Sequence, residues 1–399
     1  MAGATIDHLV SVTIFLAAIL LFISLFNQTI QTAVLYQQHR AFATKCSDLL
    51  DTILLNPSIP MDESPTVFGL NDINFTGYTL NPFSLMRLNS STGAPVSYEK
   101  TDLTYSNMTV GFGNSLLMPM GNIVGYSSAL EMLGINGAYG FQLALTPIVD
   151  VPITEDSRNP YLTLNVSVSG LSFPLANATV NYRLIPISLS GTYPDCLTIP
   201  NQAGTVYTDE AGFKRITFPD FTPDETQTYV FVAYAHVGGL AGIGFYAPDF
   251  SGSPHLIPFV KSLSENEVFL AHSLDVPETA SSSENLACNT AFVKLSNENF
   301  ELQSTATGEV SSGEGHDPQV INVPNYAGIL VVAYKDASGS GGAAVMPWGV
   351  GSLAFPVAFG GNPAEQEWVA TDMRQVLIGG VAYQAKLSLW SLQGVQVVG

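Results

Sequence analysis

The chain has little charge, and most of that charge is of one sign. Only 12% of its 399 residues are charged, and 33 Asp and Glu stand against 13 Lys and Arg, which gives a formal net charge of −20. Nucleic acid binding requires Lys and Arg opposite the phosphates. We therefore predict no nucleic acid partner, and a surface on which Ser, Thr, Asn and Gly separate scattered acids.

The sequence also lacks the spacings that assemble a metal site or an activated nucleophile. Its three cysteines form no CxxC pair, its six histidines form no HExxH or HxH, and no GxSxG is present. Glycine-rich stretches such as VGGLAGIGFY lack the Lys-Ser/Thr ending of a phosphate-binding loop. The densest polar clusters, 314–317 and 220–225, are interpreted as a solvated loop and a proline-bearing turn. We predict no catalytic residue, no cofactor and no metal site, so the chain is not expected to be an enzyme.

Charge is absent from a long segment near the N-terminus. Residues 9–26 (LVSVTIFLAAILLFISLF) contain only Ser and Thr as polar residues, and 18 helical residues span about 27 Å, close to the hydrocarbon thickness of a bilayer. The preceding MAGATIDH lacks the basic residue of a cleaved signal peptide. We predict a membrane-spanning helix. Its membrane-facing residues are predicted to be Leu9, Val12, Phe15, Leu16, Ile19, Leu20, Phe22, Ile23 and Phe26.

Proline and glycine are absent from residues 27–55, so the helix is expected to continue. An apolar stripe with helical spacing marks this half as amphipathic. Asn56-Pro57 ends it, because the residue before proline is pushed out of the α region. The residues predicted to pack on a folded head are Phe42, Leu49, Leu50, Ile53 and Leu54.

The rest of the chain has the pattern of β-strands, short runs rich in Val, Tyr, Phe and Thr between Gly, Pro, Asn and Asp. We predict a mainly β fold with one long N-terminal membrane-spanning helix and two or three β-sandwich-like domains. The predicted division is 1–57 for the helix, 58–152 for an irregular β-rich domain packed on it, 153–252 for a sandwich, and 253–399 for a C-terminal β domain.

Residues 160–250 resemble an immunoglobulin-like or transthyretin-like sandwich module. The strand-like runs are YLTLNVSVSG, ANATVNYRLIPI, GTVYTDEAGFKRITFPDF and TQTYVFVAYAHVGG, with a turn at 208–213. A weak repeat relates 229–234 (YVFVAY) to 329–334 (ILVVAY), each followed by glycines and a further strand, and predicts two related hairpins in adjacent β domains. The resemblance implies a structural or adhesive module.

Several features favour a body outside the cell. Asn-X-Ser/Thr sequons, which would carry glycans only on exported surfaces, occur at Asn74, Asn89, Asn107, Asn165 and Asn177. Cys196 and Cys288 lie in loop-like contexts and are predicted to form a disulfide. Arg40 and Lys45 follow the apolar segment, and the positive-inside rule taken alone would place the body in the cytoplasm. The sequons and the acidic β-rich body outweigh two charges inside a stalk.

The helix resembles that of archaeal type IV pilin-like surface proteins in ATIDHLVSVTIFLAAILLFISLFNQTIQTAVLYQQHR and ATKCSDLLDTILLNP, over about residues 4–57. The resemblance implies that the apolar half lies in the membrane as a monomer and in a filament core after assembly. The family's cleavage signal has a basic residue before the apolar stretch, which this chain lacks. Asp7 would take the family's acidic fifth position only after cleavage before Gly3, so processing by the usual route is not expected.

Three functions remain open at this point. The first is a structural surface protein that associates with copies of itself through the helix, in a filament or other assembly. The second is a membrane-anchored extracellular receptor or binding module. The third is an accessory subunit of a larger membrane complex that contains unrelated chains. The kind of neighbour around the helix distinguishes them.

Overall fold

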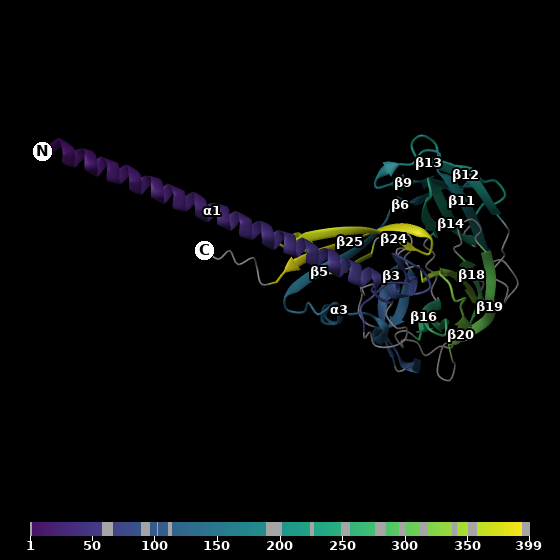
Figure 1. Ribbon diagram of the computed structural model, residues 1–399. Helices are drawn as coiled ribbons and strands as arrows, with labels where there is room; N and C mark the ends of the chain where they lie inside the picture. The colour runs from purple at the N-terminus through teal and green to yellow at the C-terminus, as the bar shows by residue number, and fades with distance from the viewer. Residues whose placement is uncertain are drawn as a thin grey trace.

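A computed structural model shows a single long helix projecting from a β-rich head (Figure 1). It describes residues 2–57, 67–88, 96–101, 103–110, 114–188, 202–223, 227–248, 256–275, 285–294, 301–311, 318–336, 341–349 and 357–392. The helix, α1 (Ala2–Leu55), has 54 residues. It ends where the sequence predicts, because Asn56 donates the last helical hydrogen bond to Thr52 (3.1 Å) and Pro57 follows.

The sheet beneath the helix joins segments that are far apart in the sequence. Its strands are β1 (Thr79–Leu80), β24 (Ala370–Ile378), β25 (Val381–Ser391), β5 (Tyr139–Pro147) and β23 (Val357–Gly360), in that spatial order. β24 and β25 form an antiparallel hairpin, and β25 continues antiparallel onto β5. Strands from the predicted segments 58–152 and 253–399 therefore lie in one sheet, so these two segments share a structural unit.

A two-sheet sandwich occupies the middle of the chain. One sheet has the order β13-β8-β7 and the other has the order β12-β11-β14-β15. Its strands are β7 (Ile153–Ser157), β8 (Leu162–Ser167), β11 (Thr179–Ser188), β12 (Gln202–Tyr207), β13 (Phe213–Phe218), β14 (Gln227–Val237) and β15 (Leu240–Tyr246). The predicted turn at 208–213 is present, with Gly212 at φ +68° and the Asp209 carboxylate accepting from the Phe213 amide. It joins strands of opposite sheets.

A second sandwich repeats this topology. Its sheets have the orders β20-β17-β16, extended by β4-β3-β2, and β19-β18-β21-β22. Its strands are β16 (Leu256–Ser262), β17 (Glu267–His272), β18 (Asn285–Lys294), β19 (Glu301–Ser311), β20 (Gln319–Asn322), β21 (Gly328–Asp336) and β22 (Gly341–Trp348), with β2 (Val96–Tyr98), β3 (Leu103–Val110) and β4 (Asn114–Pro119) added. β4 joins β16 in parallel. The predicted mainly β fold with sandwich-like domains and one long helix is confirmed.

The repeated motifs YVFVAY and ILVVAY lie at equivalent places, in hairpins β14–β15 and β21–β22. Every residue of both motifs is buried. Phe231 packs inside its own sandwich, whereas Val230 and Val232 belong to the cluster that also contains the helix and its sheet. A strand buried on both faces has a continuous apolar run instead of alternation, which explains both motifs.

Smaller elements close the head. They are β6 (Val149–Asp150), β9 (Ser169–Gly170), β10 (Phe173–Pro174), α2 (Pro82–Met86), α3 (Tyr126–Met132), and the 3₁₀ turns η1 (Glu99–Thr101), η2 (Met120–Asn122) and η3 (Pro363–Glu365). Asn81 caps α2 by accepting from the amides of Phe83 (2.9 Å) and Ser84 (3.3 Å). β6 and β9 stand between the middle sandwich and the start of β25 (Figure 1).

Candidate functional site at the junction of helix and head

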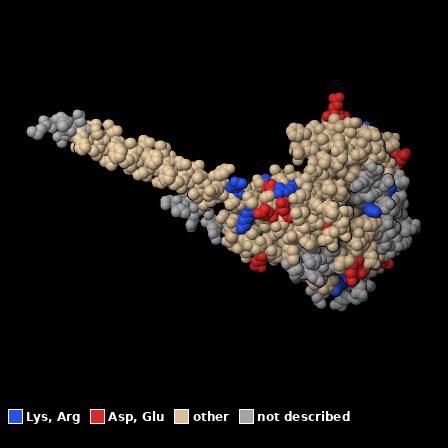
Figure 2. All heavy atoms as spheres, viewed as in Figure 1, with Lys and Arg blue, Asp and Glu red and all other residues tan. Residues whose placement is uncertain are grey.

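The two halves of α1 have different surroundings. Every side chain described between residues 8 and 34 is exposed, and this half projects beyond the head (Figures 1 and 2). Within the described residues, α1 is the one helix long and apolar enough to cross a membrane. The nine residues predicted to face the membrane all lie on the exposed half. The helix is therefore a candidate membrane anchor.

The other half of α1 buries one stripe against the head. Leu50, Ile53 and Leu54 are fully buried and Leu49 nearly so, and they share a cluster with β24, β25 and β5. Phe42 lies partly buried at the margin of that cluster. The structure therefore places all five predicted head-packing residues on the helix face that meets the sheet.

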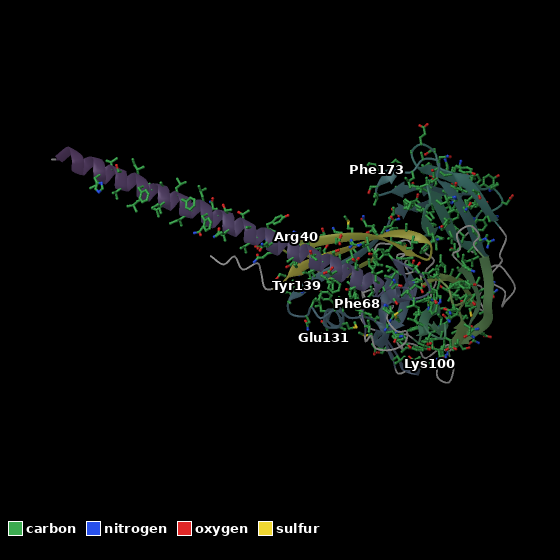
Figure 3. All side chains as sticks on the ribbon, in the orientation of Figure 1. Arg40, Phe68, Lys100, Glu131, Tyr139 and Phe173 are labelled. Atoms are coloured by element: carbon green, nitrogen blue, oxygen red, sulfur yellow. The ribbon has the colours of Figure 1, made fainter. Side chains whose placement is uncertain are left out.

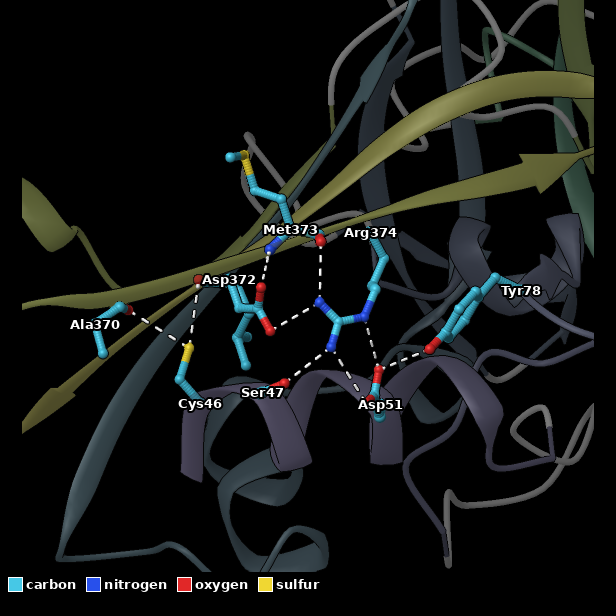
Figure 4. Close-up of polar contacts among 9 residues, drawn as sticks. Cys46, Ser47, Asp51, Tyr78, Ala370, Asp372, Met373 and Arg374 are labelled. Atoms are coloured by element: carbon cyan, nitrogen blue, oxygen red, sulfur yellow. Dashed lines mark hydrogen bonds and ion pairs between the residues drawn. The ribbon is translucent and has the colours of Figure 1, made fainter. Parts of the chain in front are cut away.

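A polar cluster beside this stripe ties the helix to the sheet (Figure 4). Arg374, on β24, donates to Asp51 through Nε (3.0 Å) and to Ser47 through Nη2 (2.9 Å), both on α1. Its Nη1 donates to Asp372 (2.8 Å) on its own strand. The Tyr78 hydroxyl also donates to Asp51 (2.9 Å). The name "clamp" is used below for Ser47, Asp51, Asp372 and Arg374.

The charged groups of the clamp are paired with one another. Hydrogen bonding to Asp51, foremost among several partners, raises the pKa of Arg374 further above its usual range, so the guanidinium stays charged. Burial alone would raise the pKa of Asp372, but hydrogen bonds from Ser47, the Met373 amide and Arg374 outweigh burial and lower it. Because the carboxylates already share one cation, the cluster offers attachment rather than acid–base chemistry.

Cys46 lies in the same stripe and has a structural role. Its thiol is fully buried and donates weakly to the carbonyls of Ala370 (3.5 Å) and Leu387 (3.6 Å). Burial, followed by the nearby charge of Asp372, raises its pKa to about 11. A thiol that is protonated at neutral pH is a poor nucleophile.

Aromatic and cationic side chains surround the helix where it leaves the head (Figure 3). Phe42 stacks on Tyr139 with ring centroids 5.8 Å apart, and Lys45 Nζ lies 4.0 Å from the centroid of the same Tyr139 ring. His39 lies against Trp368, with ring centroids 3.9 Å apart. These contacts set the angle at which the helix emerges.

The helix face opposite the head has a composition of its own. Its side chains include those of Gln37, Arg40, Ala41, Thr44, Lys45 and Asp48. Continued toward the N-terminus at 3.6 residues per turn, this face carries Ile30, Phe26 and Ile23. On the helix face that leads into the head, the corresponding residues are Gln28, Gln31 and Thr32, followed by Leu35. Ile30 and Val34 are 45% and 46% exposed. An apolar outward face therefore continues past residue 26. It consists of Ile23, Phe26, Ile30 and Val34, and is named the outer stripe.

The predicted glycosylation sites lie in contrasting environments. Asn74 and Asn177 are exposed in turns, Asn177 at φ +56°. Asn165 lies half-buried on the central strand β8, with its amide directed at Asp156 (3.4 Å). Asn107 lies on β3 and Asn89 is outside the described residues.

The predicted disulfide stays a prediction, because Cys196 lies outside the described residues. Cys288 is buried on β18, where its Sγ lies 2.8 Å from Oε1 of Gln319. Within the part of the chain that the structure describes, no group of three or more His, Cys, Asp and Glu is placed to hold a metal ion.

Sequence reasoning missed the C-terminal half of the junction. Asp372 and Arg374 share one face of β24 with Val376 and Ile378. Two charges on the apolar face of a strand need partners. Their presence on that face was the available signal for a polar contact. Nothing local to β24 shows that the partners are Ser47 and Asp51, more than 320 positions earlier.

Comparisons with known proteins find only weak similarities. No protein family model matches the chain, and no curated protein matches it. Among solved structures, the D0-D1 domain of intimin is similar at 14% identity and a TM-score of 0.22, over 50% of this chain and 99% of that one. Alpha-2-macroglobulin of E. coli is similar at 9% identity and a TM-score of 0.22, over 68% of this chain and 19% of that one. Similarities this weak carry no argument about function.

Proposed function

We propose that this chain is a membrane-anchored extracellular structural protein of pilin-like architecture, which associates with copies of itself through α1 into a surface filament or assembly. Residues 9–26 anchor it in the bilayer, and the β head, held by the clamp and the buried stripe, is displayed outside. The plan of apolar half-helix, amphipathic half-helix and β head supports the resemblance to archaeal pilin-like proteins.

The observation that carries the proposal is the outer stripe. A helix that only tethered a head would be polar all round once it left the membrane. Here Ile30 and Val34 remain exposed beyond residue 26, on the side away from the head. Apolar side chains in that position gain free energy when another helix covers them.

Charges on the same face suit a second copy of the helix. Arg40 precedes Asp48 along this face. Two parallel copies offset by about 12 Å, the rise of eight helical residues, would bring Arg40 of one beside Asp48 of the other. Such pairs contribute little affinity but fix the register between helices.

An extracellular body is supported by surface chemistry. Asn74 and Asn177 are exposed sequons in turns, which is where an exported chain accepts glycans. The surface of the head is acidic with few charges, which is compatible with exposure to water (Figure 2).

The proposal is tested by paired cysteine variants of the full chain in its native membrane. Ile30→Cys lies on the outer stripe, and Gln28→Cys, two residues away and on the opposite helix face, is the matched control. Oxidation is expected to cross-link Ile30→Cys to another copy and to leave Gln28→Cys monomeric. Electron microscopy of membranes and of material sheared from cells then shows whether the cross-linked copies form filaments.

Two results would contradict the proposal. Equal, weak cross-linking of both variants would mean that lipid surrounds the helix, as in a plain anchor for a binding module. Cross-linking of Ile30→Cys to an unrelated chain would mean an accessory subunit of a mixed complex.

A further inference from the structure

A thiol and a side-chain amide lie in close contact inside the second sandwich. Cys288, on β18, is fully buried, and its Sγ lies 2.8 Å from Oε1 of Gln319, on β20. The Cys46 thiol, in contrast, lies 3.5 and 3.6 Å from the oxygens to which it donates. Because a carbonyl carbon lies about 1.2 Å from its oxygen, Sγ of Cys288 is within about 4 Å of Cδ of Gln319. Reacting atoms in a productive geometry are about 3–3.5 Å apart, so a small shift brings this sulfur and carbon together.

Glycine on the neighbouring strand makes room for the Gln319 side chain. Gly308, on β19, is paired directly with Cys288 in the β18–β19 ladder. A Cβ at Gly308 would lie 2.6 Å from Cδ of Gln319, closer than side chains approach one another. The Gln319 side chain therefore passes over the backbone of β19 where no side chain obstructs it. On the other side of Cys288, the paired Tyr334 is also buried, so the thiol is confined between two strands.

Gln319 is a polar residue on an apolar strand face. It shares the inner face of β20 with the buried Ile321, and it is paired with the buried Leu270 of β17. Its side chain crosses from this sheet to the sheet that contains β18. A buried amide costs free energy unless it has a good partner, and a thiol is a weak one. A position that served only to fill the core would favour an apolar residue.

We propose that Cys288 and Gln319 condense to an internal thioester that joins the two sheets of the second sandwich. The sulfur forms a bond with Cδ of Gln319, the bond between Cδ and Nε2 breaks, and the thiol proton leaves with the nitrogen as ammonia. The step changes no oxidation state and requires no co-reactant. Escape of ammonia drives the condensation forward, and exclusion of water from the buried site protects the product from hydrolysis.

The thioester makes Gln319 an acyl donor, and the matching acceptor is a primary amine. The amine nitrogen attacks Cδ, the bond to sulfur breaks, and the proton lost by the nitrogen restores the Cys288 thiol. Gln319 is partly exposed, and β19 and β20 are the edge strands of their sheets. These strands lie on the side of the head remote from the projecting half of α1 (Figure 1). An amine-bearing surface can therefore reach the site from the edge of the sandwich.

The test is peptide mapping of the full chain by mass spectrometry, with N-ethylmaleimide present to label free thiols. The peptides that contain Cys288 and Gln319 are expected to be joined, unlabelled, and lighter by about 17 Da, the mass of ammonia. Methylamine is the probe for the acceptor. It is expected to release the Cys288 thiol and to leave a methylamide on Gln319. The Tm is expected to fall by about 5 °C, because a cross-link between residues 31 positions apart is lost.

Two variants control for non-specific labelling. Gln319→Glu keeps the shape of the side chain but has no ammonia to release, and Cys288→Ala removes the nucleophile. Both are expected to incorporate methylamine at residue 319 at least tenfold less than the unchanged chain. The mass measurement on the unchanged chain decides the question even if one variant fails to fold.

Each other outcome would overturn the proposal. Recovery of Gln319 as glutamine, together with a labelled Cys288 thiol, would mean that the contact is only a hydrogen bond. A thioester that hydrolysed during handling is distinguished from this, because it leaves glutamate at position 319. A disulfide between Cys196 and Cys288 would remove about 2 Da instead and would confirm the predicted pair. None of these results depends on association through α1, so the proposed function stands or fails separately.

Discussion

The division of α1 into a half buried against the head and a half exposed beyond it predicts opposite effects for one substitution made at two places. Ile53 is fully buried between the helix and the sheet, whereas Ile30 is 45% exposed on the outer stripe. Ile53→Ala removes buried carbons and leaves a cavity in the cluster that joins α1, β24 and β25. Substitutions of this kind cost about 2–5 kcal/mol, a large share of the 5–15 kcal/mol by which a domain is stable.

The assay is thermal unfolding of the full chain in detergent, followed by the fluorescence of the buried Trp348 and Trp390. Ile53→Ala is expected to lower the Tm by roughly 5–10 °C. Ile30→Ala, the same change in the same helix, is expected to cost less than about 0.5 kcal/mol. In membranes the order reverses, because Ile30→Ala weakens association between copies and Ile53→Ala does not touch that interface.

Equal lowering of the Tm by the two substitutions would refute this prediction. That result would mean that α1 does not complete the core of the head, and that the head folds without it. The prediction also fails if Ile53→Ala costs less than about 1 kcal/mol, since no fully buried isoleucine in a close-packed cluster is so easily replaced.

Three further predictions concern the junction and the surface. In a double-mutant cycle of Asp51→Asn and Arg374→Met, unfolding in urea is expected to give a coupling of about 1 kcal/mol, because both side chains are partly exposed. A coupling near zero would show that the ion pair does not stabilise the junction. Asp372 has a lowered pKa in the folded chain, so its contribution to stability is complete above its ordinary pKa of about 4 and is lost as the pH falls through the folded value. Asp372→Asn should flatten the stability profile below about pH 4, and an unchanged profile would contradict the assignment. Intact mass measurement of the native protein is expected to lose one glycan with Asn177→Gln and none with Asn165→Gln, because Asn177 is exposed in a turn and Asn165 is half-buried on β8; loss at Asn165 alone would refute the ordering.

Local chemistry predicts what is local in this fold. The helix, its end at Asn56-Pro57 and the burial stripe follow from periodicity and from the backbone restriction before proline. The turn at 208–213 follows from two residues. The Asp209 side chain accepts a backbone hydrogen bond, and Gly212 adopts the positive φ that the turn requires. None of these elements needs knowledge of residues far along the chain.

Long-range pairing is where prediction from the sequence stops. The run at 370–378 alternates like any half-buried strand, and its pairing with 381–391 is a simple hairpin. Its place beneath α1, however, depends on Arg374 meeting Asp51 across 323 positions. The parallel pairing of β4 with β16 is equally remote. The domain boundaries predicted from the sequence therefore separate strands that pair with one another in the same sheet.

The arrangement of the cores determines how force on the helix would reach the head. Each sandwich has its own inner core, yet Val232 of β14 and Val331 of β21 lie in the cluster that also contains Leu50 and Ile53 of α1. Close-packed interiors transmit strain with little compliance, so force on α1 is expected to pass through this shared cluster to both sandwiches. The stretch from Asn27 to Val34 has exposed side chains throughout. In the proposed assembly, a second helix packed on the outer stripe would support that stretch between the head and the membrane-spanning segment.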